Sequence, residues 1–284
     1  MEILTKSRIG TLLIVLSASS SLFAQNKGSD KPQNEPIVMD ARQIVRQSLV
    51  AAELSWQARN AYIYMERDED RRLDSAGQLQ SQNVDVTRMT LVNGIRFEQL
   101  MEHNGQLPSA EDQKKSDQDI ERLKHETTAE QTERLRKEQE NRSFLHVLLD
   151  AFDFHLIGEE VAGGRRTYVL EATPHPGYHA SGKYGKLLAR VQGKLWVDKQ
   201  DFGWVKVDGE VTQSFSMGLF VARVQRGSHI LLEQICLGDA IWVPKRLEVR
   251  ASARILLLKS LELDRILTYS DYRPAADGSY SVKK

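Results

Sequence analysis

The sequence has little of what usually reveals a function: it has one cysteine, no excess of charge and few long apolar runs. Cys236 is the single cysteine, so no disulfide can form within the chain, and burial of apolar side chains must supply its stability. Its apolar neighbours predict a buried, unreactive thiol. Acidic and basic residues number 39 each, for a formal net charge of 0. Because binding to nucleic acid requires a basic excess, we expect no nucleic-acid partner.

The one long apolar run lies at the N-terminus. Lys6 and Arg8 precede an apolar stretch at residues 9–16, and small residues follow up to Ala24. This pattern is typical of a secretory signal peptide over residues 1–24, and the run falls short of the roughly 20 residues of a membrane span. No cysteine follows it for lipid attachment. We therefore predict export to the periplasm, a disordered lead at residues 25–38, a single domain at 39–284 and no membrane span in the mature chain.

Catalytic motifs are absent as well. The chain has no glycine-rich phosphate loop with lysine, no His-Glu-x-x-His motif, no Gly-x-Ser-x-Gly elbow and no paired cysteines. His175 and His179 form one ligand-like pair, which would hold zinc only with a third group such as Glu171 or Asp153. A metal-dependent hydrolase is therefore the third-ranked alternative. We predict instead a protein that is not an enzyme and uses no cofactor and no metal.

The C-terminal half predicts a run of antiparallel strands, at residues 191–199, 203–213, 219–225, 229–237, 241–253 and 256–273. Apolar and polar residues alternate in it, so that Val205 and Val207 are expected on one face with Ile241, Val243, Leu247 and Val249. Earlier strands are predicted at residues 60–72, 83–101, 154–161 and 165–172, with tight hairpins at Asn93-Gly94 and Gly163-Gly164. One face of such a sheet is apolar and must be covered.

Two apolar helices are predicted to cover that face. The first spans residues 40–59 and carries Ile44, Val45, Leu49, Ala52 and Trp56 on one side, and the second spans residues 144–154 and includes Phe152. Between them, residues 109–142 are crowded with charges of both signs and predict a helical insertion, either a lid over a cavity or a solvated excursion. The charge cluster at residues 67–72 is interpreted as a solvated strand end.

Four short motifs carry a resemblance to a known family. They are Gly193-Lys-Leu-Trp-Val-Asp-Lys199, Val205-Lys-Val-Asp208, Trp242-Val-Pro-Lys-Arg-Leu-Glu248 and Tyr269-Ser-Asp-Tyr-Arg273. With the export signal, the sequence resembles the outer-membrane lipoprotein-sorting protein family, which is related to the Lol-type periplasmic carriers. The resemblance implies a half-open antiparallel β-barrel whose concave face is capped by helices around a space for acyl chains.

We therefore expect an α+β, β-rich fold with a curved sheet and helices on its concave face. The predicted function is to bind or carry a lipid or an acylated lipoprotein in an apolar cavity. The alternative is an envelope-sensing or protein-interaction module of the same fold, with no lipid cargo and a protein partner at residues 109–142. The residues predicted to line the cavity are Trp56, Phe152, Val205, Val207, Ile241, Val243, Leu247 and Val249.

Overall fold

The computed structural model describes residues 39–74, 76–179, 184–217, 222–238, 240–255 and 259–275. The predicted signal peptide and lead, residues 1–38, lie outside these residues and stay predictions. The predicted division into one domain with a charged insertion also stays a prediction.

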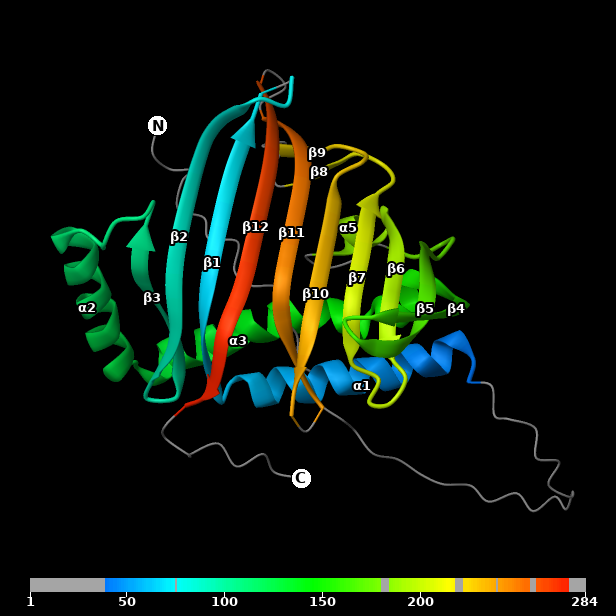
Figure 1. Ribbon diagram of the computed structural model, residues 1–284, viewed down its shortest axis with the longest axis horizontal. Helices are drawn as coiled ribbons and strands as arrows, with labels where there is room; N and C mark the ends of the chain where they lie inside the picture. The colour runs from blue at the N-terminus through cyan, green and yellow to red at the C-terminus, as the bar shows by residue number, and fades with distance from the viewer. Residues whose placement is uncertain are drawn as a thin grey trace, which may run out of the picture.

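Ten strands form one antiparallel sheet in the order β3-β2-β1-β12-β11-β10-β7-β6-β5-β4 (Figure 1). Within the described residues the outer strands β3 and β4 do not pair with each other, so the sheet is open. A short hairpin of β8 and β9 attaches to β11. The expected α+β fold with an open, curved sheet is confirmed. The strands are β1 (Tyr62–Leu73), β2 (Leu79–Val92), β3 (Ile95–His103), β4 (Phe152–Ala162), β5 (Arg165–Pro174), β6 (Val191–Asp198), β7 (Trp204–Val211), β8 (Phe215–Met217), β9 (Ala222–Val224), β10 (His229–Leu237), β11 (Ile241–Ile255) and β12 (Lys259–Pro274).

Two of the turns have the backbone that their residues predict. Asn93 and Gly94 have φ values of 50° and 74°, and Gly163 and Gly164 have 56° and 77°. Two-residue hairpin turns need this left-handed backbone at both central positions because it follows the twist of the strands. The hairpins β2–β3 and β4–β5 therefore form where the sequence predicts them.

The helix α1 (Ala41–Arg59) covers one face of the sheet. It begins at Asp40, whose carboxylate accepts a hydrogen bond from the Gln43 amide at 2.7 Å in a capping box. In Figure 1 it runs across the lower ends of the strands, and it contacts β4 and β11. Below, the face of the sheet that packs on α1 is called the covered face. Its largest buried cluster comprises Ile44, Val45, Leu49, Leu145, Leu170, Leu195 and Val197.

Two buried serines attach α1 to the sheet. Ser48 Oγ accepts a hydrogen bond from the indole of Trp204 on β7 at 2.9 Å, and Ser55 Oγ accepts one from the backbone amide of Trp242 on β11 at 3.0 Å. A buried donor left without an acceptor costs about 1–3 kcal/mol, so these bonds define where the helix crosses the strands.

The second predicted helix, residues 144–154, is wrong in its C-terminal part. The structure has α2 (Ala110–Lys124), α3 (Thr128–His146) and the short α4 (Leu148–Ala151), and β4 begins at Phe152. Phe152 and Phe154 pair with Pro174 and Ala172 in the β4–β5 ladder, so they belong to a strand. Only the earlier leucines are helical, and Leu145 is buried against α1. The last helix is α5 (Gly185–Leu188).

The charge cluster at residues 67–72 forms the C-terminal half of β1, which ends at Leu73, and most of it is half-buried rather than solvated. Alternate side chains point to opposite faces. Glu69 forms an ion pair with Arg67 on the face away from α1, whereas Asp68 on the covered face accepts a hydrogen bond from Arg265 Nε at 2.8 Å. The charged residues of this run therefore form polar contacts on both faces of the sheet.

Candidate functional site

The two faces of the sheet differ in chemistry across β1, β12 and β11. The face turned away from α1 carries ion pairs, such as Arg71–Asp264 at 3.0 Å. Partly exposed pairs of this kind contribute about 0–1 kcal/mol each. The covered face also carries the Asp68–Arg265 pair, but it holds in addition a buried cluster made of Tyr64, Met89, Leu267 and Tyr269. A ligand with an apolar part would therefore find its apolar surroundings on the covered face.

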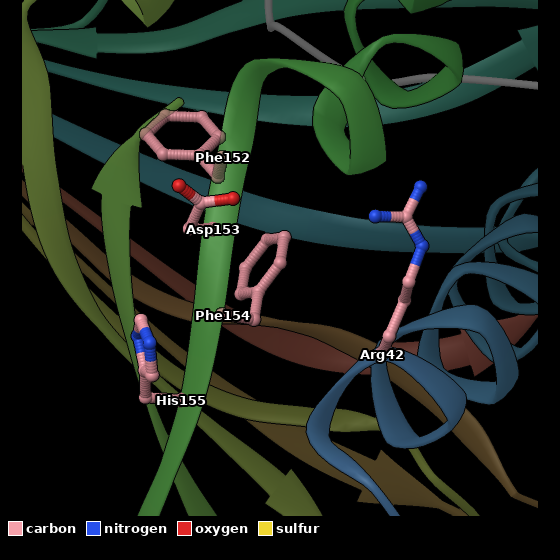
Figure 2. A pocket seen from close by; sticks show the side chains of 5 residues that line it. All are labelled: Arg42, Phe152, Asp153, Phe154 and His155. Carbon is pink, nitrogen blue, oxygen red and sulfur yellow. The ribbon is translucent and has the colours of Figure 1, made fainter. Parts of the chain in front are cut away.

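Two hollows open at the end of α1 where the helix begins, one next to β4 and the other next to α4. Figure 2 shows the hollow next to β4. Both hollows share Arg42 of α1. In Figure 2 the Phe154 ring projects from β4 toward the helix that carries Arg42. One hollow of about 220 Å³ is lined by Arg42, Phe152, Asp153, Phe154 and His155. The other, of about 320 Å³, is lined by Arg42, Leu149, Asp150, His175, Gly177 and Tyr178.

The structure does not gather the eight predicted cavity residues onto one surface. Phe152 lines a hollow, and Trp56 lies at the other end of α1, beside Arg59. Val207 packs against the α1 cluster and Leu247 against the tyrosine cluster of β1 and β12. Val205 joins Trp196 and Trp242 in a separate cluster. Val243 is fully buried, and Ile241 and Val249 are half-buried. Their role as ligand contacts stays a prediction.

Two β-bulges explain why the alternation misleads. The β6–β7 register shifts next to Val205, between the pairs Trp196–Lys206 and Val197–Trp204. The β10–β11 register shifts at Lys245, between Glu233 and Gln234 on the partner strand. One extra residue in a strand reverses the side-chain direction beyond it. The expectation that Val205 and Val207 share a face is therefore wrong, since they fall in different clusters.

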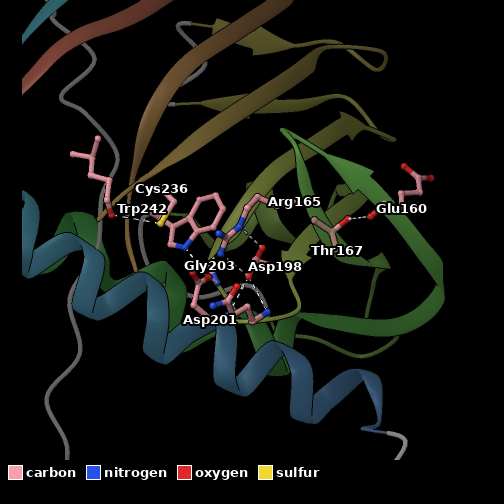
Figure 3. Close-up of polar contacts among 10 residues, drawn as sticks. Glu160, Arg165, Thr167, Asp198, Asp201, Gly203, Cys236 and Trp242 are labelled. Atoms are coloured by element: carbon pink, nitrogen blue, oxygen red, sulfur yellow. Dashed lines mark hydrogen bonds and ion pairs between the residues drawn. The ribbon is translucent and has the colours of Figure 1, made fainter. Parts of the chain in front are cut away.

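The cluster that holds Val205 rests on a polar network in the β6–β7 loop (Figure 3). Arg165 donates to Asp198 at 2.7 Å and to Asp201 at 2.8 Å, and the Trp242 indole donates to Asp201 at 2.9 Å. Burial alone would raise the pKa of Asp198, but its hydrogen bonds from Arg165 and from loop amides hold that pKa below its ordinary value. The network orients a loop and offers no reactive group.

Cys236 adjoins this network and is half-buried rather than fully buried. Its Sγ donates to the Leu237 carbonyl oxygen at 3.4 Å. Burial, with the nearby Asp201 carboxylate, raises the pKa of the thiol. The thiolate is the nucleophilic form, so the structure gives Cys236 no reactive character.

His175, one of the two histidines of the hydrolase alternative, lies beside a carboxylate. His175 Nδ1 lies 2.8 Å from Asp153 Oδ1, on an exposed part of the surface. In the described part of the chain, no three histidine, cysteine or acidic side chains come together to bind a metal ion.

A charged group that the sequence analysis missed lies where α1 ends. Glu66 of β1 faces it, and burial together with Glu98 and Asp68 raises the pKa of Glu66 to about 7. Burial likewise raises the pKa values of Tyr269 and Tyr272 above their ordinary values. No local signal distinguishes Glu66 in the sequence, because it opens the charged run at residues 66–72.

None of the helices in the described ranges has the length and apolar character needed to cross a membrane.

Comparisons with known proteins came from solved structures alone, because no family model and no curated protein matches the chain. A DUF1329 family protein from Desulfovibrio piger is 13% identical, with 86% of this chain and 96% of that chain covered and a TM-score of 0.32. An outer membrane lipoprotein-sorting protein domain from Vibrio parahaemolyticus is 11% identical, with 84% and 95% covered and a TM-score of 0.29. The Pseudomonas aeruginosa MucA/MucB complex matches at 12% identity, with 83% and 99% covered and a TM-score of 0.25. The solved structures similar to this chain thus include a protein of the lipoprotein-sorting kind that the sequence resembles.

Proposed function

We propose that this chain is an exported, periplasmic binding protein that shields the apolar part of a lipid or an acylated ligand and catalyses no reaction. The observation that carries this proposal is the pair of hollows at the start of α1, where Phe152, Phe154 and Leu149 supply apolar walls. Arg42 lines both hollows, Asp153 lines the first and Asp150 lines the second. A partly apolar hollow with charged groups in its lining suits an acyl chain that ends in a polar head.

The energetics favour a ligand of this class. Burying an acyl chain gains about 0.8 kcal/mol per CH₂ group, or roughly 10 kcal/mol for a typical chain. Association and ordering cost about 4–15 kcal/mol, so a single chain binds marginally by apolar contact alone. The larger hollow, about 320 Å³, lies at the low end of ordinary ligand pockets, which range from about 300 to 1,000 Å³. A polar contact at the head of the ligand is therefore required for useful affinity.

The test is a titration of the purified mature chain with a fluorescent fatty acid, supported by native mass spectrometry. Phe154→Asp places a charge in the hollow and should weaken binding at least about tenfold. Ile157→Asp is the matched control, since Ile157 lies on the same strand and is 49% exposed. Equal affinity for the two variants, or no fatty acid binding by the wild type, would contradict the proposal.

A second candidate is a protein-interaction module, and the helix α2 favours it. None of its residues is buried, and it carries charges of both signs beside β3. This candidate applies if the wild-type chain binds no fatty acid in the titration. In that case, replacing Lys114 and Lys115 with glutamate should abolish capture of a partner protein. Unchanged capture by that variant would weigh against α2 as the contact surface.

A further inference from the structure

Arg59 is the last residue of α1, and its guanidinium is buried without a full set of partners. The residue is 1% exposed, and its Nε and Nη2 atoms have no hydrogen-bond partner among the described residues. Burial and the neighbouring Arg96 lower the pKa of Arg59 only to about 10, so it remains a cation at neutral pH. A buried charge with unpartnered donors is costly, which points to a group that completes the site.

Arg96 of β3 brings a second cation to the same place. The Arg59 Cζ atom lies 4.4 Å from the centroid of the Trp56 ring, and the Arg96 Cζ atom lies 5.9 Å from the same centroid. Arg96 also donates a hydrogen bond to the Tyr64 hydroxyl, and its Cζ lies 5.5 Å from the Tyr64 ring. Two guanidinium groups, which repel each other, thus converge on one aromatic ring.

The nearby carboxylates do not neutralise this pair. Asp68 is already bound to Arg265. Glu66 and Glu98 lie close enough to raise the pKa of Glu66, and none of the ion pairs formed within the described ranges joins an acidic residue to Arg59 or Arg96. Glu66 is part-protonated at neutral pH, so it supplies only part of a negative charge beside the two arginines.

We propose that Arg59 and Arg96, with the rings of Trp56 and Tyr64, form a binding site for an anionic group, either a carboxylate or a phosphate. Guanidinium groups offer several N–H donors in a planar fork that matches both anions. The anion is either the head of an amphiphile or a free ion, and the chemistry of the site is the same for both. The site lies about 25 Å along α1 from Arg42, at a rise of 1.5 Å per residue, so it is independent of the hollows at β4.

The test uses isothermal titration calorimetry of the full mature chain with three probes: inorganic phosphate, dodecyl phosphate and dodecanol. We expect dodecyl phosphate to bind at least about tenfold more tightly than dodecanol. Arg96→Gln and Arg59→Met should each weaken binding of dodecyl phosphate at least about tenfold and leave binding of dodecanol unchanged. Arg88→Gln is the matched control, because Arg88 is an exposed arginine on β2. Circular dichroism checks that each variant folds, and Arg96→Gln decides the matter if Arg59→Met does not fold.

Each outcome has a distinct meaning. Binding of inorganic phosphate that Arg96→Gln abolishes supports a site for a free anion, whereas binding of dodecyl phosphate alone supports the head of an amphiphile. Equal binding of dodecanol and dodecyl phosphate, unaffected by both variants, would overturn the anion site and leave the proposed acyl function intact. Binding of dodecyl phosphate that Arg96→Gln abolishes and Phe154→Asp leaves unchanged would overturn the acyl hollow alone.

Discussion

Glu66→Gln tests the buried charges on the covered face. The Oε2 atom of Glu66 is buried and has no hydrogen-bond partner among the described residues. Burial, together with the carboxylates of Glu98 and Asp68, raises the pKa of Glu66 from 4.5 to about 7 in the folded protein. Glutamine has nearly the same shape and cannot ionise, so the substitution removes the titration with little change in packing.

The sign and size of the effect follow from proton linkage. A carboxyl whose pKa is raised on folding binds its proton more tightly in the folded state, so its contribution to stability is fully present below pH 4.5 and is lost as the pH rises to 7. A shift from 4.5 to about 7 corresponds to about 3.4 kcal/mol in total, of which about 2.5 kcal/mol falls between pH 5 and pH 8. The wild type should therefore lose about 2.5 kcal/mol more than Glu66→Gln over this interval.

Urea denaturation of both proteins at pH 5 and pH 8 measures this difference. Glu69→Gln is the control from the opposite face of the same strand: a hydrogen bond from Arg67 holds the pKa of Glu69 below its ordinary value, so its stabilisation is nearly complete at pH 5 and changes little up to pH 8. If Glu66→Gln and Glu69→Gln show the same pH dependence as the wild type, Glu66 is not the buried acid inferred here.

Three further predictions concern contacts within the fold. Gly203→Ala places a Cβ atom 1.9 Å from the Trp242 indole nitrogen and should lower the free energy of unfolding by about 1–3 kcal/mol in urea; Gly238→Ala, where a Cβ meets nothing within 4 Å, should change it by less than about 0.5 kcal/mol. Ser48→Ala removes the acceptor of a buried indole N–H and should cost about 1–3 kcal/mol in the same assay, and no loss would contradict the role of Ser48 in placing α1. Cys236 should react with a thiol reagent at least about tenfold more slowly in the native protein than in urea, and equal rates would contradict a raised pKa.

Local signals in the sequence were sufficient for many elements of the fold. The Asn93-Gly94 and Gly163-Gly164 turns place two hairpins because their backbone conformation is a property of these residues themselves. Asp40 marks the start of α1 because an aspartate there caps the first amides of a helix. The bounds of β10, His229–Leu237, are those predicted from its apolar run.

The candidate sites were less predictable, because they depend on how distant elements meet. Phe152 was predicted to be helical because leucines precede it, and only its pairing with Pro174 made it part of a strand. Trp56 was expected on an apolar stripe, but its ring lies under two guanidiniums, one from α1 and one from β3. No spacing within the chain relates Arg59 to Arg96.

By itself the sequence determined the hairpins and the apolar helix α1. It also determined that the chain has no net charge and a single cysteine, so that a covered apolar core must supply its stability. These depend on the conformational preferences and polarity of neighbouring residues, which a chain carries into any fold. Only the tertiary structure decided which side chains face α1, because a bulge in either strand of a pair reverses the alternation beyond it. It alone also buried Arg59 and raised the pKa of Glu66, since desolvation depends on what packs around a charge and not on the residues beside it.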